Sequence, residues 1–174
     1  MAGSGADDPG RRLVVVAMGS NIDPAVHLPA ACRRIAAVDG WTLVRCSPVY
    51  ASAPVGRTDQ PEFANAAVLI ELPSATEPAA IKQTLRAIEA AGDRVRDPND
   101  RHGPRTIDLD LTLVEGVVCD DPPLPDPDLA KRWFVAVPCG DVAPELVVPG
   151  DGRTLGQIAA GFERPSPSAI VLDR

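Results

Sequence analysis

The chain has 174 residues, which suits one compact domain, and 45% of them are hydrophobic, so a core can form and a wholly disordered chain is excluded. The 17 basic and 24 acidic residues give a formal net charge of −7, which argues against binding nucleic acid or a membrane surface over a broad face. No apolar run is long enough to span a membrane, and the first twelve residues are small and polar. We therefore expect a cytoplasmic protein. Its four separated cysteines are expected to be reduced thiols.

The first half of the chain predicts three strands and one helix. An apolar, β-branched run that ends in a Gly-Ser-Asn turn is typical of a buried strand, and a cap residue followed by proline is typical of a helix start. In chain order we expect a strand over Leu13–Met18, a helix that Asp23 caps and that runs from Pro24 to Asp39-Gly40, a strand over Trp41–Ser47, a polar loop over Ser52–Pro61 and a strand over Asn65–Leu72.

The second half adds a helix, a strand and a proline-rich end. We expect, in order, a helix capped by Thr76 with Ile81, Leu85 and Ile88 on one face, a charged loop over Gly92–Pro104, a strand over Thr106–Val114, and short helices near Asp128–Cys139 and Thr154–Ala160. The order βαββαβ predicts an α+β, ferredoxin-like sandwich, in which both main helices pack on one face of an antiparallel sheet. As domain boundaries we expect a disordered tail over 1–12, a single domain over 13–163 and a loose tail over 164–174.

The strongest chemical signal is a pair of acids on the last predicted strand. Because side chains alternate along a strand, Asp108 and Asp110 share one face while Ile107, Leu109 and Leu111 face the core. Two adjacent carboxylates repel each other, and Mg²⁺, which takes one or two carboxylates together with substrate phosphates, relieves that repulsion. The alternative is an ordinary solvated strand face.

Several basic side chains precede the acid pair. Arg94, Arg96, Arg101 and Arg105 fall within twelve residues, with His102 among them. Guanidinium groups beside metal-binding carboxylates are suited to phosphoryl transfer, in which positioning and charge neutralisation supply most of the catalysis. The alternative is that these arginines pair with acids of the same loop. Because no P-loop or nucleophile set is present, any ATP must be handled by the metal and the arginines.

These residues, together with several separated blocks, resemble the 6-hydroxymethyl-7,8-dihydropterin pyrophosphokinase family of folate biosynthesis. The similarity covers roughly Val14–Ala160, and the Gly103–Leu111 block is its most specific part. The matching blocks, in order, are Ala17–Asn21, Ser47–Tyr50, Pro54–Gly56, Asp59–Pro61, Phe63–Ala66, Glu89, Arg94–Arg96, Gly103–Leu111, Arg132–Phe134, Pro138 and Ala143–Leu146.

The resemblance implies an ATP-dependent enzyme that transfers pyrophosphate to the hydroxymethyl group of a reduced pterin. It implies that Asp108 and Asp110 hold two Mg²⁺ ions against the triphosphate and that Arg94 and Arg105 stabilise charge on the transferred group. The nucleotide side would comprise Glu89, Arg96, His102, the backbone near Leu111, and Arg132.

The resemblance also implies where the pterin binds. Its ring would stack between Phe63 and Phe134, while the Asn65 amide and the segment that contains Ser52, Pro54 and Val55 would read its polar edge. The implied partners are ATP and the reduced pterin, without nucleic acid or membrane, and the protein is expected to be a monomer.

Two other functions stay open, and departures from the family pattern motivate the second of them. Asp126 stands where the family usually has histidine, and His102 stands where it commonly has tryptophan. One alternative is a nucleotidyltransferase that uses the same acid pair on a ferredoxin-like fold. The other is a relative that binds nucleotide or pterin without catalysis.

Overall fold

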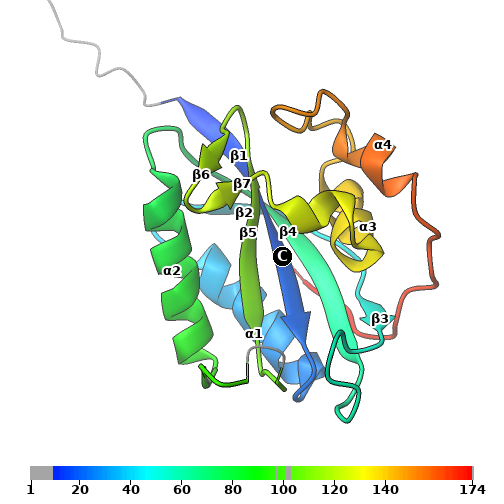
Figure 1. Cartoon of the computed structure of the whole chain (residues 1–174). Helices are drawn as coiled ribbons and strands as arrows, with labels where there is room; N and C mark the ends of the chain where they lie inside the picture. The colour runs from blue at the N-terminus through cyan, green and yellow to red at the C-terminus, as the bar shows by residue number, and fades with distance from the viewer. Residues whose placement is uncertain (1–9, 97, 101–102, 174) are drawn as a thin grey trace, which may run out of the picture.

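A five-stranded antiparallel sheet forms the centre of the protein (Figure 1). The computed structural model describes residues 10–96, 98–100 and 103–173. The strands are β1 (Arg11–Ser20), β2 (Thr42–Cys46), β3 (Tyr50–Ser52), β4 (Phe63–Pro73) and β5 (Asp108–Val114). Their order is β2-β4-β1-β5, and β3 continues the edge beside β4. The first strand of the chain is therefore interior to the sheet, where it pairs with both β4 and β5.

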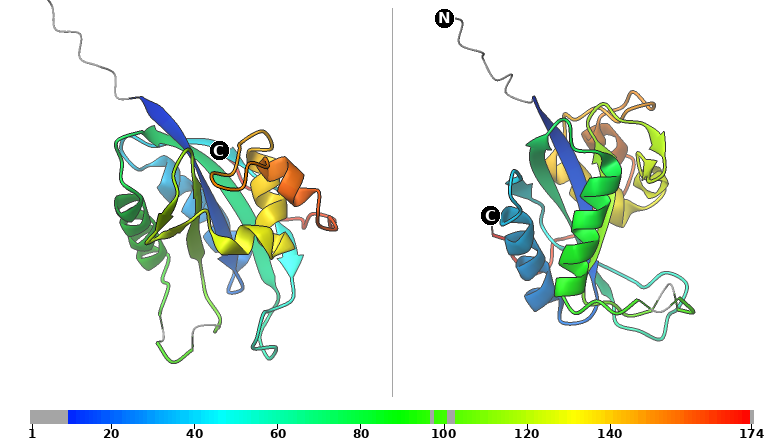
Figure 2. Two further views of the ribbon diagram at one scale, coloured as in Figure 1. Left: turned by 45° about the horizontal axis from the view of Figure 1, so that its top comes forward. Right: turned by 90° about the vertical axis from the view of Figure 1, so that its left-hand side faces the viewer.

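Helices cover both faces of this sheet (Figure 2). Helices α1 (Pro24–Ala36) and α2 (Pro78–Ala91) lie on one face, which confirms the predicted ferredoxin-like α+β sandwich. Helices α3 (Trp133–Val142) and α4 (Leu155–Ala159) lie on the other face, and a 3₁₀ helix, η1 (Pro127–Ala130), precedes α3. A small hairpin of β6 (Cys119–Asp120) and β7 (Pro123–Leu124) follows β5.

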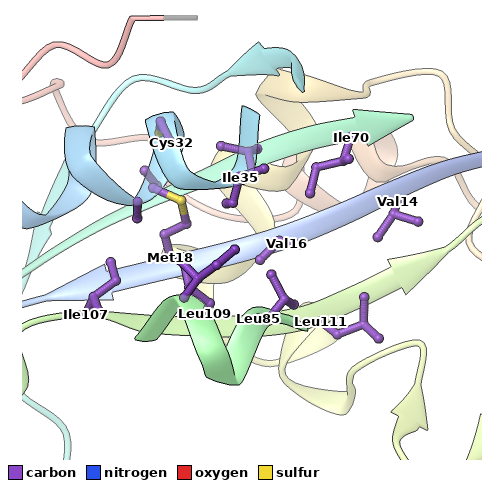
Figure 3. Packing of buried hydrophobic residues seen from close by; sticks show 14 of the residues in the cluster. Val14, Val16, Met18, Cys32, Ile35, Ile70, Leu85, Ile107, Leu109 and Leu111 are labelled. Carbon is purple, nitrogen blue, oxygen red and sulfur yellow. The ribbon is translucent and has the colours of Figure 1, made fainter. Parts of the chain in front are cut away.

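Because β1 is covered on both faces, its apolar run is continuous. Val14, Val16 and Met18 pack against α1 and α2 (Figure 3), whereas Val15 packs into the second cluster, beneath α3 and α4. The chain therefore builds two hydrophobic layers on one sheet, and the second layer leaves part of its face open for a site. In the described part of the chain, no helix combines the length and apolar character needed to cross a membrane.

Several expected boundaries are wrong by a few residues. Helix α1 ends at Ala36 instead of Asp39, and Asp23 is its N-cap residue but makes no side-chain cap hydrogen bond. The N-cap of α2 is Glu77 instead of Thr76. The expected strand over Thr106–Val114 begins at Asp108. Such ends depend on tertiary contacts and on one or two hydrogen bonds, which local sequence specifies weakly.

Two expectations about the later segments need similar adjustment. The helical region expected over Asp128–Cys139 is divided between η1 and α3, and α3 extends to Val142. The capping signal at Thr154 is confirmed, because Thr154 and Gln157 form a reciprocal capping box at the start of α4. The sequence predicts a loop at Ser52, which the structure instead places in strand β3, because β3 forms only through its pairing with β4.

The segment 164–173, expected to be loose, contains no helix or strand but is held against the domain. The Ser168 amide donates to the Val49 carbonyl at 2.7 Å, and Ile170 and Leu172 pack against the core beneath α1 and α2. Arg164, at its start, joins Tyr50 of β3 and Asp141 of α3 in a hydrogen-bonded cluster. Sequence composition shows neither partner, because both lie far from this segment along the chain.

We expect the burial of Tyr50 to make stability fall steeply at high pH. Burial, reinforced by the hydrogen bond to Asp141, raises the pKa of Tyr50 from 10.0 to about 12. Between those values the unfolded chain loses this proton while the folded chain keeps it, so stability falls as pH rises, by about 3 kcal/mol at most. Urea unfolding at pH 9 and pH 11.5 should show this loss in the wild type and a smaller loss in Tyr50→Phe. Equal losses in the two proteins would contradict it.

Candidate active site

A cavity of about 680 Å³ opens on the sheet face that carries α3. This volume lies in the range of small-molecule sites in proteins. Its walls come from the ends of β1, β4 and β5, from the loops before β4 and β5, and from the segment η1–α3. Segments far apart in the sequence therefore meet over one face of the sheet, at the ends of these strands.

Strand register forms the floor of the cavity. Gly19 of β1 pairs with Asn65 of β4 on one side and with Asp108 of β5 on the other, so the three residues form one row. Ala17 lies one row further along, opposite Asp110. A Cβ at Gly19 would lie about 4 Å from Asn65 and Asp108, so the absence of a side chain on Gly19 leaves open space between these two residues. Because neighbouring strands lie about 4.8 Å apart, the row places the Cα atoms of Asn65 and Asp108 roughly 10 Å apart.

Two guanidinium groups neutralise the carboxylate of Asp108. Arg94 pairs with one of its oxygens and Arg105 with the other. Burial alone would raise the pKa of Asp108, but these two charges outweigh it and lower the pKa below its ordinary value. Asp108 is therefore ionised, and the arginines that hold it are those expected to act on phosphate.

Glu89 of α2 holds the arginine loop from behind the cavity. Its side chain is only 2% exposed and accepts from Arg94 at 2.7 Å, from Arg96, and from the Leu109 amide at 2.8 Å. Burial raises the pKa of Glu89 despite these cations. This residue does not line the cavity, so its expected nucleotide role is better described as holding the two arginines that do.

Asp110 supplies a second carboxylate to the wall of the cavity. Within the described residues it makes no hydrogen bond or ion pair through its side chain, and it faces the cavity. Desolvation in the concave wall and then the charges of Asp108, Asp126 and Glu89 raise the pKa of Asp110 to about 7. An unpaired oxygen donor among other acids suits a hard divalent cation.

No group of three or more His, Cys, Asp or Glu side chains converges as a ready metal cage in the ranges that the structure describes. Asp108 and Asp110 can supply carboxylate ligands, and further ligands would have to come from a substrate or from water. This donor set is of the kind that Mg²⁺ uses beside phosphates.

The Asn65 amide presents its oxygen to the cavity. Its nitrogen donates to the Ser52 hydroxyl at 2.9 Å and to the backbone carbonyls of Tyr50 and Phe63. Since carbonyls only accept hydrogen bonds, this orientation is set by the protein. A free amide offers both a donor and an acceptor, but in this orientation Asn65 offers a ligand an acceptor alone, suited to an amino or N–H group.

The two expected stacking rings line the same cavity, each beside an arginine. The guanidinium of Arg105 lies 5.4 Å from the centre of the Phe63 ring, and that of Arg132 lies 5.7 Å from the Phe134 ring. Arg132 also pairs with Asp128 at 3.0 Å. The rings are half-buried, so they have accessible surface for a flat ligand.

Asp126 lines the cavity, and its side chain also has a structural role as a helix cap. Its carboxylate accepts from the Asp128 amide at 2.8 Å and so caps η1. Its negative charge therefore stays in the wall of the cavity, where it has a structural partner in the backbone.

The structure brings most of the expected site residues together. Those that line the cavity are Ser52, Val55, Phe63, Asn65, Arg94, Arg96, Arg105, Asp108, Asp110, Arg132 and Phe134. Pro54 does not line it, and the Leu111 side chain packs in the core on the opposite face of the sheet. His102 and Arg101 lie outside the described residues.

Sequence reasoning missed several contacts that shape the site. Asn21 accepts from the Arg105 amide at 2.8 Å and donates to Gln60 and Pro61, so one side chain holds both loops. Arg57 and Asp100 join the same two loops at 2.5 Å. The Gly-Ser-Asn motif marked Asn21 as a turn residue, but nothing local indicated its distant partners.

Comparison with known proteins gives a consistent result. Residues 15–144 match the family model described as 7,8-dihydro-6-hydroxymethylpterin-pyrophosphokinase. A 2-amino-4-hydroxy-6-hydroxymethyldihydropteridine pyrophosphokinase of Pseudomonas aeruginosa is 39% identical over 159 residues, which cover 87% of this chain and 95% of that protein. The protein of the same name from Methylorubrum extorquens is 40% identical over 137 residues, covering 77% of this chain and 84% of its own.

Solved structures support the fold. The Plasmodium falciparum HPPK-DHPS triple mutant crystallised with pteroate superposes with a TM-score of 0.64 at 10% identity. The match covers 89% of this chain but 44% of that longer one, so the likeness concerns one part of it. The wild-type Plasmodium protein with pteroate gives a TM-score of 0.63 at 11% identity, over 87% of this chain and 42% of the other.

Proposed function

Because the chain belongs to the 7,8-dihydro-6-hydroxymethylpterin pyrophosphokinase family, we propose that it transfers pyrophosphate from ATP to the hydroxymethyl group of 6-hydroxymethyl-7,8-dihydropterin. Family membership makes it an enzyme, a pyrophosphokinase of folate biosynthesis. One observation supports the detailed proposal: a single cavity holds an acid pair with arginines over β5, and an amide with aromatic rings over β4 and α3. The products are AMP and the pterin diphosphate.

The triphosphate binds over β5 and the arginine loop. Arg94 and Arg105 neutralise Asp108 without a ligand, and phosphate oxygens offer both guanidinium groups a more highly charged partner. On nucleotide binding the arginines move from carboxylate to phosphate, where they stabilise charge on the transferred group. Arg96 and Arg132, at the cavity wall, complete the basic surround.

Asp108 and Asp110 would hold Mg²⁺, and we propose two ions shared between these carboxylates and the phosphates. The fit rests on Asp110, an unpaired carboxylate among other acids in the described part of the chain. When bound, magnesium neutralises phosphate charge and orients the groups for in-line transfer. Release of Asp108 by the two arginines frees its oxygens for this role.

The pterin binds over β4, with its ring stacked on Phe63 and Phe134. Asn65 accepts from an amino or N–H group of the heterocycle, because the nitrogen of its amide is already committed. Burial of this amide, which is 7% exposed, makes an unmatched ligand edge costly and so gives selectivity.

The test is a product assay with Mg-ATP and 6-hydroxymethyl-7,8-dihydropterin. We expect AMP and pterin diphosphate in equal amounts, little AMP without the pterin, and no turnover when EDTA removes the metal. Chromatography and phosphorus NMR separate these products from pyrophosphate.

Other outcomes would identify the alternatives. Release of free pyrophosphate would indicate nucleotidyl transfer, and calorimetric binding of both substrates without AMP would indicate a non-catalytic relative. We also propose that the enzyme is a monomer, which light scattering of the purified chain measures directly.

A further inference from the structure

A hydrogen-bonded cluster lies behind the pterin half of the cavity. The Tyr50 hydroxyl donates to Asp141 at 2.7 Å, and Arg164 donates to the other oxygen of Asp141 at 2.6 Å and to the Tyr50 oxygen at 2.8 Å. The Arg164 guanidinium also lies 5.8 Å from the centre of the Tyr50 ring. We call these three residues the β3–α3 clamp, because they join strand β3 to helix α3 through the segment after α4.

Both elements in the clamp carry a wall of the pterin site. On the strand side, the Tyr50 carbonyl accepts from the Asn65 amide, and Ser52, two residues on, accepts from the same nitrogen. On the helix side, Phe134 precedes Asp141 by seven residues, which is two turns of α3, so both side chains lie on the same side of the helix. The clamp therefore links the amide that reads the pterin edge to a ring that stacks on the pterin.

Arg164 is itself held in place by the segment that follows it. Figure 1 shows this orange-to-red segment descending from α4 past β3. Ser168 bonds to Val49, the residue before Tyr50, and Leu172 packs on the core. Arg164 lies beyond residues 15–144, which match the family model, so the clamp adds an outside residue to a site built from the matched part.

We propose that Arg164 is a positioning residue for the pterin, which fixes the separation between the β3–β4 wall and the α3 wall of the cavity. This inference rests on the proposed function. The Arg164 side chain is 57% exposed, although that of Asp141 is only 12% exposed, so solvent screens the ion pair from one side. A purely structural role of Arg164 therefore predicts only a small drop in stability when it is removed. Loss of Arg164 leaves Tyr50 and Asp141 joined by one hydrogen bond, which allows the two walls to shift. Among the described residues, none of the hydrogen bonds and ion pairs of the clamp reaches β5, which carries the nucleotide half of the cavity.

The test separates the two substrates kinetically. Arg164→Ala should raise the KM for the pterin about fivefold or more. The KM for ATP should change less than twofold, and the midpoint of thermal unfolding should shift by less than about 2 °C. Arg164→Lys, which keeps a cationic donor, should recover part of the loss. Arg153→Ala removes another exposed arginine that pairs only with its neighbour Asp151 among the described residues, and should change none of these values.

Two results would overturn the proposal. One is an unchanged pterin KM in Arg164→Ala; the other is an equal rise in both KM values together with a lower unfolding temperature, which marks general destabilisation. Phe134→Ala, checked for folding by circular dichroism, tests the underlying site. If it raises the pterin KM while Arg164→Ala does not, the clamp alone is rejected. If neither variant changes it, the pterin location is rejected as well.

Discussion

Replacing Asp110 by asparagine is expected to lower kcat about 10³-fold or more while the protein stays folded. The change keeps the size of the side chain but removes the charge of the carboxylate that we expect to bind metal. Loss of a charge-stabilising group at a phosphoryl-transfer site costs about 4 kcal/mol of transition-state stabilisation. Stability should not fall, because the substitution also removes a carboxylate that is crowded by Asp108, Asp126 and Glu89.

The measurement is AMP formation at saturating Mg-ATP and pterin, repeated over a range of Mg²⁺ concentrations. Asp120→Asn is the matched control, since this exposed acid of β6 lies outside the cavity and should keep wild-type turnover. Wild-type turnover with unchanged Mg²⁺ dependence in Asp110→Asn would remove the metal assignment.

Replacing Glu89 by alanine is expected to lower the free energy of unfolding by about 3 kcal/mol and to impair catalysis. The substitution leaves Arg94, whose side chain is 10% exposed, with one partner fewer and leaves the Leu109 amide unpaired. Removing one member of a buried ion pair costs roughly 3–5 kcal/mol, because the remaining charge stays buried. Activity should fall because both Arg94 and Arg96 lose the group that holds them at the cavity.

Urea unfolding of the wild type and three variants measures this effect. Glu89→Gln keeps an oxygen that can accept from Leu109, so it should lose less stability than Glu89→Ala. Glu145→Ala, an exposed acid after α3, should change the free energy of unfolding by less than about 0.5 kcal/mol. A loss below about 1 kcal/mol in Glu89→Ala would show that the network is not the support that we describe.

Periodic patterns made much of the fold predictable. The apolar run over Leu13–Met18 forms the buried strand that it predicts, and Ile107 and Leu109 pack in the core while Asp108 lines the cavity, as the predicted alternation requires. These predictions succeed because the energy of burying apolar side chains depends on spacing along the chain, which the sequence displays directly.

The partners of the polar groups were not predictable in the same way. Asn65 could be placed on a strand, but its orientation depends on carbonyls of Tyr50 and Phe63, which only strand pairing brings near. Arg164 reads as part of a loose tail until Tyr50 and Asp141 are in place. Hydrogen bonds between distant segments leave no periodic signal in the sequence. The residues of the site could therefore be named from the sequence, but their hydrogen-bond partners and orientations could not be predicted.

The row formed by Asn65, Gly19 and Asp108 fixes the distance between the two halves of the cavity. In the proposed arrangement the pterin lies over β4 and the triphosphate over β5, with β1 between them, so the spacing of the hydrogen-bonded strands sets the distance between the two substrates. Loop substitutions can change how fast substrates enter, but they leave this length unaltered. To bind a longer acceptor, a redesigned enzyme would therefore need substitutions in the strands beneath the cavity, at Ala17 or Gly19, or a binding position further from the sheet.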